Sequence, residues 1–405
     1  MIRNCLFVCF ASCLAAQSAE WSSRFDETND RVWISADTWA NPMEDWQIKD
    51  GRLECLRGAE NRNVHLLTHW LGKKKGDLKM SVEIGVLSKA RKRGSVGFAL
   101  GVHDRDTGSH LSSLFFGEGL PVGINTEGRL FIGHKKSAHQ LKPLTDLSMS
   151  VTATPTSAHY KVQLTVKMNC DTAQFVATVP ASRLIGNLAL VCNHGANRRP
   201  HVNGVGPKAR FWFRDWKVSG SKVVEDKSVT FGPILYAMHT LSRKVMKMTA
   251  QMPPLGKRDP QTVRLQIKDK EWKTIQEQRI DALSHTATFR VKNWDDQKDV
   301  PYRLVYGDHQ FTGTVRKDPV KKNEIVVAGF TGNTDAGFPN ARIVRNLKIM
   351  NPDVLFFSGD QIYESVGGYG IFRNPVPLAT LNYLRKIYMW GWAFRDVMRD
   401  RPTLV

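Results

Sequence analysis

Hydrophobic and polar residues alternate with a period of two over most of the first 223 residues. The clearest runs are Met80 to Val86, Val96 to Val102, Tyr160 to Met168 and Phe211 to Val218. Such alternation predicts half-buried antiparallel strands, and no long amphipathic helical pattern interrupts them. We therefore predict that residues 20–223 form a two-sheet β-sandwich of jelly-roll type.

A second β-rich block covers residues 224–320. Val263, Leu265 and Ile267 alternate with polar neighbours, and Tyr302 begins a similar run before Gly307. A length of about a hundred residues suits a sandwich of the immunoglobulin or fibronectin type.

The pattern changes at Glu324, so residues 321–405 form a third segment. Two short continuous apolar runs, 325–328 and 354–357, flank a helical stretch with Ile343, Leu347 and Met350 on one face. Continuous rather than alternating strands indicate a parallel sheet buried on both faces. A second, longer helical stretch ends near Arg401, and the segment is therefore expected to be α/β.

The N-terminus carries Arg3, the apolar run Leu6 to Leu14, and small residues as far as Ala19. This pattern predicts a signal peptide over residues 1–19 and an exported protein, periplasmic, cell-surface or secreted. A lipoprotein box ending at Cys13 is a less favoured alternative. The run is too short to span a bilayer, and no later stretch is apolar enough for a transmembrane segment.

The chain contains 58 Lys and Arg against 38 Asp and Glu, a net charge of +20. This excess favours anionic partners such as phosphorylated substrates or polyanionic glycans. The charges are scattered, without an aromatic-interleaved basic helix, which argues against specific nucleic-acid binding. Beyond the signal region, Cys55, Cys170 and Cys192 allow either one disulfide with a buried thiol or three inert buried thiols.

The strongest chemical candidate is Asp360, because a carboxylate after Gly359 at the carboxyl end of a buried strand can approach a metal ion. Tyr363 follows three residues later, and Asn333 and Asp335 follow the first strand of the same segment. All four would face one crevice and serve as metal ligands. The alternatives are turn caps for the acids and ring packing for the tyrosine.

Several other features of the sequence allow more than one interpretation. Gly367 to Gly370 is either a flexible active-site loop or a plain turn, because it lacks a phosphate-binding fingerprint. The aromatic helix around Trp390 and the Trp-rich strand around Trp212 are read as core rather than as ligand platforms. All twelve histidines lie between His65 and His309, and they are read as scattered surface or core residues.

The third segment resembles the start of the PhoD-type alkaline phosphatases, within the calcineurin-like metallophosphoesterase superfamily. The motifs are Ala328-Gly-Phe-Thr-Gly-Asn333, Asn351-Pro-Asp353, Gly359-Asp-Gln-Ile-Tyr-Glu364, and Tyr388 through Gly391-Trp-Ala-Phe-Arg-Asp396 to Asp400-Arg-Pro402. The preceding block is similar to that family's N-terminal immunoglobulin-like domain, and residues 20–223 resemble concanavalin-like sandwiches in pattern only.

The resemblance implies a metal-dependent phosphomonoesterase or phosphodiesterase acting on phosphate esters, with calcium and iron as metals. Asp360 would bridge the metals, and Tyr363 would bind the iron-like ion. The family's Ser-Cys pair is replaced by Thr331-Gly332, so Asn333 or Asp335 would supply that ligand. The family's Asp-Asp-His-Asp motif and its later histidines do not occur in this sequence, which resembles a C-terminally truncated member. We therefore expect this chain alone to be inactive and poorly soluble, and leave open whether it is an enzyme.

The rival hypothesis is a non-catalytic exported protein whose β-sandwiches bind a glycan or another protein. In that reading the third segment is a remnant of a phosphatase. The missing histidines favour it for the chain taken by itself.

Overall fold

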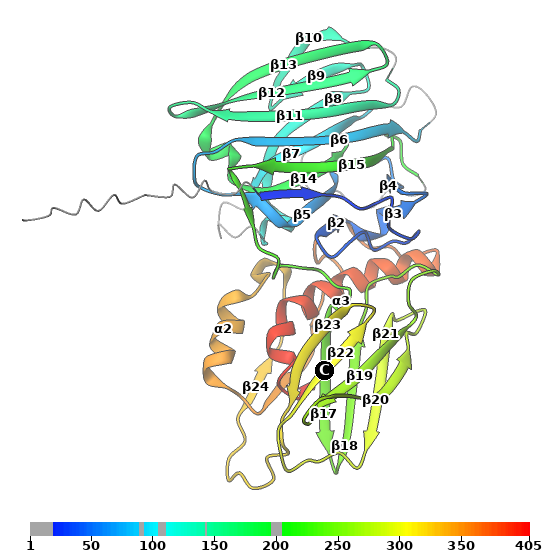
Figure 1. Cartoon of the computed structure of the whole chain (residues 1–405), viewed down its shortest axis with the longest axis vertical. Helices are drawn as coiled ribbons and strands as arrows, with labels where there is room; N and C mark the ends of the chain where they lie inside the picture. The colour runs from blue at the N-terminus through cyan, green and yellow to red at the C-terminus, as the bar shows by residue number, and fades with distance from the viewer. Residues whose placement is uncertain (1–18, 89–92, 104–110, 142–143, 196–204) are drawn as a thin grey trace, which may run out of the picture.

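A computed structural model describes residues 19–88, 93–103, 111–141, 144–195 and 205–405. A large β-sandwich lies above a smaller β unit, and the C-terminal helices and parallel strands lie between and beside them (Figure 1). The predicted signal peptide falls outside the described residues, apart from Ala19, which begins the first strand.

The large sandwich consists of two antiparallel sheets of eight strands each. The first has the order β13-β12-β11-β6-β15-β4-β3, with β1 paired to β15. Its strands are β1 (Ala19–Ser22), β3 (Trp46–Lys49), β4 (Arg52–Cys55), β6 (Leu78–Val86), β11 (Leu147–Pro155), β12 (His159–Met168), β13 (Asp171–Pro180) and β15 (Phe211–Gly220).

The second sheet has the order β10-β9-β8-β7-β14-β5-β16, with β2 paired to β5. Its strands are β2 (Thr38–Asn41), β5 (Arg62–Leu71), β7 (Ser95–His103), β8 (Glu118–Asn125), β9 (Arg129–Ile132), β10 (Lys135–Gln140), β14 (Gly186–Cys192) and β16 (Val223–Glu225). The short helix α1 (Ser113–Phe116) and 3₁₀ turns at Met43–Asp45 and Ala181–Leu184 complete the unit.

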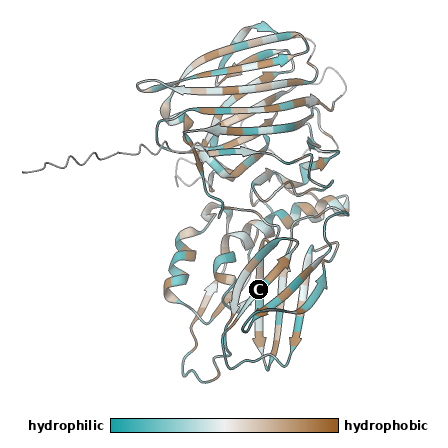
Figure 2. Cartoon of the chain, viewed as in Figure 1, coloured by the Kyte–Doolittle hydropathy of each residue, from teal (hydrophilic) through white to brown (hydrophobic). Residues whose placement is uncertain are grey.

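The period-two pattern places one side of each strand in the core between the sheets. Met80, Val82 and Ile84 of β6 are buried there, as are Phe98 and Leu100 of β7. The alternation of apolar and polar residues is visible along the strands in Figure 2. The prediction of a β-sandwich for this region is confirmed at this level.

The smaller β unit has a three-stranded sheet, β17-β18-β21, and a four-stranded sheet, β20-β19-β22-β23. Phe289 and Tyr302 are fully buried in its core. The strands are β17 (Tyr236–Ser242), β18 (Val245–Gln251), β19 (Thr262–Lys268), β20 (Trp272–Arg279), β21 (Thr286–Lys292), β22 (Val300–Tyr306) and β23 (His309–Val315). Its relation to immunoglobulin or fibronectin domains stays a prediction.

The C-terminal segment contains a three-stranded parallel sheet in the order β24-β25-β26. Its elements are β24 (Val327–Phe330), α2 (Ala341–Met350), β25 (Val354–Phe357), α3 (Val376–Met398) and β26 (Thr403–Leu404). Parallel strands joined by helices agree with the sequence pattern. The sequence did not indicate β26.

The expectation that both faces of this sheet are buried is wrong. The strands follow one another in a single direction, and right-handed crossovers therefore place α2 and α3 on the same face. Leu355 and Phe357 are buried beneath the helices, whereas Val327, Phe356 and Leu404 on the other face are 54%, 43% and 48% exposed. One face of the sheet is therefore uncovered among the described residues.

The helix α2 also turns a different side inward from the one expected. Val344 and Leu347 pack into the core, whereas Ile343 and Met350 are exposed. The expectation that the aromatic helix is core is confirmed, because Trp390, Trp392 and Phe394 of α3 are buried.

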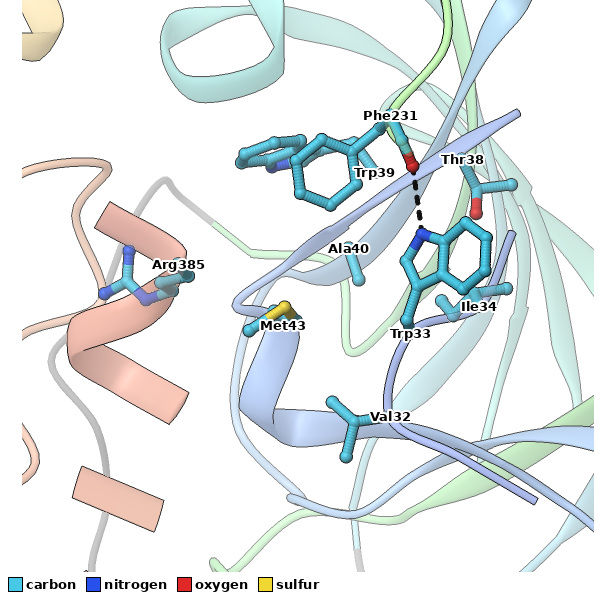
Figure 3. A pocket seen from close by; sticks show the side chains of 9 residues that line it. All are labelled: Val32, Trp33, Ile34, Thr38, Trp39, Ala40, Met43, Phe231 and Arg385. Carbon is cyan, nitrogen blue, oxygen red and sulfur yellow. Dashed lines mark hydrogen bonds between the residues drawn. The ribbon is translucent and has the colours of Figure 1, made fainter. Parts of the chain in front are cut away.

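The helix α3 joins the large sandwich to the C-terminal segment. Trp392 stacks on Trp39 at a centroid distance of 5.8 Å, and Trp390 meets Phe357 edge-on at 4.9 Å. Figure 3 shows the junction beside Trp33, whose indole N–H donates to the Phe231 carbonyl at 3.0 Å. The cavity there is about 20 Å³, which is room for about one water molecule rather than a ligand.

The cysteines that the structure describes are all free thiols. Cys55 and Cys192 are buried, whereas Cys170 is exposed, so the idea of three buried thiols is wrong for Cys170. Burial, followed by the neighbouring Cys55, raises the pKa of Cys192. None of the described helices is both long and apolar enough to cross a membrane.

Candidate functional site

The predicted ligand residues lie at the carboxyl ends of β24 and β25. Asp360 follows Gly359 in a left-handed conformation with φ of 54°. The Tyr363 hydroxyl donates to Asp360 Oδ2 at 3.1 Å, and the Asn333 backbone N–H donates to the Asp360 carbonyl at 3.0 Å. Three of the four predicted residues therefore lie together at the end of the sheet.

Asp335 has a different contact. It begins a 3₁₀ turn, Asp335–Gly337, and its Oδ2 accepts a hydrogen bond from the Gly367 backbone N–H at 2.7 Å. Asp335 therefore anchors the glycine-rich loop.

The cluster fits a complete metal centre poorly. The described residues include no group of three or more His, Cys, Asp or Glu side chains placed to hold a metal ion. Desolvation and the hydrogen bond to Asp360 raise the pKa of Tyr363, so its oxygen remains a phenol unless a cation replaces the proton. One carboxylate and one phenol fall short of the ligands that a dinuclear hydrolytic site requires.

The glycine-rich loop forms a turn, which is one of the two predicted alternatives, because the Gly368 backbone N–H donates to the Ser365 carbonyl at 2.9 Å. Gly367, Gly368, Tyr369 and Gly370 have φ values of 70°, 69°, 62° and 72°, which explains three glycines in four positions. Arg385 on α3 donates to the carbonyls of Val366 and Gly368 at 3.2 and 2.9 Å. This conformation places Tyr369 in contact with the large sandwich.

Tyr369 contacts the first residues of β5 and the turn before it. Its hydroxyl donates to the Asn61 carbonyl at 2.9 Å and accepts from Asn63 Nδ2 at 3.2 Å. The Arg62 guanidinium lies 5.3 Å from the ring centroid and pairs with buried Asp45 at 2.9 Å. The C-terminal segment thus supplies one side chain to the surface of the second sheet.

That surface contains a groove of about 690 Å³ on the outer face of the second sheet. Ligand sites typically occupy about 300–1,000 Å³. One cross-strand row forms its centre: His65 pairs with Ala189, Ala189 with Ala99, and Ala99 with Pro121. The turn residue Gly133 bonds to Pro121 at the far end. The groove is hollow because the side chains in the middle of this row, Ala189 and Ala99, are small.

Polar groups surround this apolar floor. Asn61, Asn63, His65 and Tyr369 lie on one side, His134 lies at the β9–β10 turn, and His194, Arg183 and Glu118 complete the polar lining. The five neighbouring strands β5, β14, β7, β8 and β9 span about 19 Å, because adjacent strands lie about 4.8 Å apart. The groove is therefore wide enough for an extended ligand.

His65 is the most unusual group in the groove. Its side chain is 3% exposed, and Nδ1 has no hydrogen-bond partner. Burial lowers the pKa of His65 to about 3, and burial lowers that of His194 to about 4. Both imidazoles are consequently neutral.

Sequence patterns alone did not single out this groove. The sequence predicts a scattered histidine at His65, because a single histidine on an alternating strand has no distinguishing spacing. The strand register reveals the site, since it aligns Ala189, Ala99 and Pro121 beside His65. The only signal in the sequence was the run of small residues on three strands.

No family model and no curated protein matches this sequence. Among solved structures, the basic winged bean lectin with Tn-antigen aligns over 51% of this chain and 99% of its own length, with 8% identity and a TM-score of 0.34. Peanut lectin with a 9mer peptide aligns over 52% and 100%, with 12% identity and a TM-score of 0.35. Alginate lyase Aly36B aligns over 49% and 96%, with 12% identity and a TM-score of 0.30.

Proposed function

We propose that the groove of the large sandwich binds an extended glycan. The observation that carries this proposal is the hollow row from His65 to Pro121, apolar at its floor and lined by amide, imidazole, phenol and guanidinium groups. Sugars present hydroxyl groups around apolar ring faces, so they match a lining of polar donors and acceptors above small aliphatic side chains. The width across five strands favours an oligosaccharide over a single sugar.

A carbohydrate screen followed by calorimetry tests this function. The whole chain would be screened against neutral and uronate oligosaccharides, and the best ligand titrated as a series of increasing length. We expect affinity to rise with the number of sugar units and then level off once the groove is filled. Failure to retain any of these glycans would contradict the proposal.

Two variants test where the glycan binds. Ala99→Leu fills the centre of the groove and should abolish binding. His65→Phe keeps the ring but removes its nitrogens, and should weaken binding about tenfold, as expected for one lost hydrogen bond. His159→Phe, at an exposed position of β12, is the matched control and should bind as the wild type does. A wild-type affinity in Ala99→Leu would place the glycan elsewhere.

A second candidate function rests on the Asp360–Tyr363 pair and on the resemblance to PhoD-type phosphatases. We propose it in a limited form: the pair binds one trivalent or divalent cation such as iron, as part of a phosphoesterase-like site. The supporting observation is the 3.1 Å contact between the Tyr363 hydroxyl and Asp360 at a strand end. The described residues do not complete a hydrolytic centre, and release of phosphate from esters by this chain alone is not expected.

Addition of ferric ion to the chain tests this second candidate. A phenolate bound to ferric iron gives a visible charge-transfer absorption, which should disappear in both Tyr363→Phe and Asp360→Asn. Tyr383→Phe, which removes a hydroxyl from the exposed side of α3, is the control. If the wild type shows no such absorption, the pair is a structural hydrogen bond and nothing more.

A further inference from the structure

A second polar cavity, of about 450 Å³, lies between the smaller β unit and the C-terminal segment. Thr314 of β23 and Arg316, which follows this strand, line the cavity. Lys348 of α2 and residues 399–401 at the end of α3 line it as well. Asn351 and Pro352, which precede β25, lie beside the cavity, because their oxygens accept hydrogen bonds from Arg316. The cavity is therefore at the opposite end of β25 from Asp360.

Two guanidinium groups converge on one neutral oxygen in this cavity. Arg316 donates to Asn351 Oδ1 at 2.6 Å, and Arg401 donates to the same atom at 3.0 Å. Asn351 ends α2 in a left-handed conformation, and its backbone N–H caps the Leu347 carbonyl. An amide oxygen carries no net charge, so it does not neutralise either arginine.

The carboxylates around the cavity bond to other groups. Asp396 pairs with Lys348 at 3.3 Å and with Arg399 at 3.4 Å. Asp400 accepts from the Thr314 backbone N–H, and Asp299 accepts from that of Lys317, both at 2.9 Å. Among the described residues, neither Arg316 nor Arg401 forms an ion pair within 4.0 Å.

Burial makes the positive charge of Arg401 energetically less favourable than that of Arg316. It is only 5% exposed, and its Nε has no hydrogen-bond partner. Desolvation, and then the charge of Arg316, lower its pKa, whereas the charge of Asp400 raises it. A buried charge beside a like charge is unfavourable unless an opposite charge compensates it.

We propose that this cavity binds a small tetrahedral oxyanion, phosphate or sulfate, between Arg316 and Arg401. Guanidinium groups bind such anions through paired, charge-assisted hydrogen bonds. Lys348 lies on the same cavity, where it is paired with Asp396 at 3.3 Å. Because Arg316 follows the smaller β unit and Arg401 belongs to the C-terminal segment, the anion bridges the two and stabilises their contact.

Calorimetric titration of the full chain with inorganic phosphate tests the site, with sodium chloride holding the ionic strength constant. We expect one saturable site and a melting temperature that rises with phosphate concentration. Sulfate should compete for the site. Glycerol 3-phosphate distinguishes an esterified phosphate from the free ion, because only a site open to solvent accepts both.

Arg316→Gln should lower the phosphate affinity by about tenfold or more, since it removes a charge-assisted hydrogen bond. Arg345→Gln removes an exposed positive charge of α2 that does not line the cavity, and it should leave the affinity unchanged. If Arg401→Gln does not fold, the Arg316 and Arg345 variants still decide the question. Absence of saturable binding at millimolar phosphate, or an equal loss in Arg345→Gln, would overturn the proposal.

Discussion

Buried histidines make stability depend on pH at the scale of single residues. Burial lowers the pKa of His65 from 6.5 to about 3, and that of His194 and His239 to about 4. The unfolded chain therefore binds more protons than the folded chain between about pH 6.5 and about pH 4. The free energy of unfolding is highest above this window and falls as the pH is lowered through it.

We predict that His65→Gln reduces this acid sensitivity. Each buried histidine contributes a slope of up to about 1.4 kcal/mol per pH unit within the window, so the variant should show a shallower decline between pH 6 and pH 4. Urea unfolding at several pH values measures the slope. His159→Gln, at an exposed position, should leave it unchanged. An unaltered slope in His65→Gln would mean that its imidazole is accessible to protons in the folded chain.

The sequence predicts residue clusters where they are local and misses them where they depend on strand register. Asp360 and Tyr363 meet because they are three residues apart on one loop, and Asn333 joins them because parallel strands end at one edge. His65 and Ala99 are 34 positions apart. They share a row only through β14, and no periodicity in either strand reveals that neighbour.

At the scale of elements, the contact between α3 and the large sandwich includes one buried carboxylate. Glu44 is 3% exposed and accepts hydrogen bonds from Asn382 Nδ2 at 2.6 Å and from Arg385 Nε at 3.2 Å. Arg385 in turn holds the carbonyls of the glycine-rich loop. The position of Tyr369 in the groove therefore depends on Glu44.

We predict that Glu44→Gln destabilises the protein by about 3 kcal/mol, because it leaves the Arg385 charge buried beside a neutral amide. The glycine-rich loop should become sensitive to limited proteolysis at the same time. The control Glu83→Gln breaks a 2.6 Å pair with exposed Arg214 and should cost less than about 1 kcal/mol. Equal effects of the two variants in denaturant unfolding would show that the junction does not depend on Glu44.

Element types were predictable here, but the faces of the elements were less so. Alternating strands and continuous strands were separated correctly, because the period of the pattern depends only on neighbouring residues. The buried side of α2 was not, because Ile343, Val344, Leu347 and Met350 are all apolar. The choice between them follows from which side of the parallel sheet the crossovers occupy.

At the scale of the whole molecule, one face of the parallel sheet is uncovered among the described residues. Val327, Phe356 and Leu404 form an apolar surface on adjacent strands, and β24 and β26 are both edge strands among the described residues. Exposed apolar patches and bare strand edges both promote association between molecules. The large net charge of +20 opposes this association through repulsion, and salt weakens that repulsion.

We therefore predict self-association that increases with protein concentration and with salt. Phe356→Lys places a charge at the centre of the uncovered face, and sedimentation velocity should show a shift toward the monomer. Leu283→Lys is the matched control, because Leu283 is 72% exposed on the smaller β unit, away from this face. If both variants associate as the wild type does, contacts between molecules use another surface. A wild-type chain that stays monomeric in high salt would show that the uncovered face is too small to drive association.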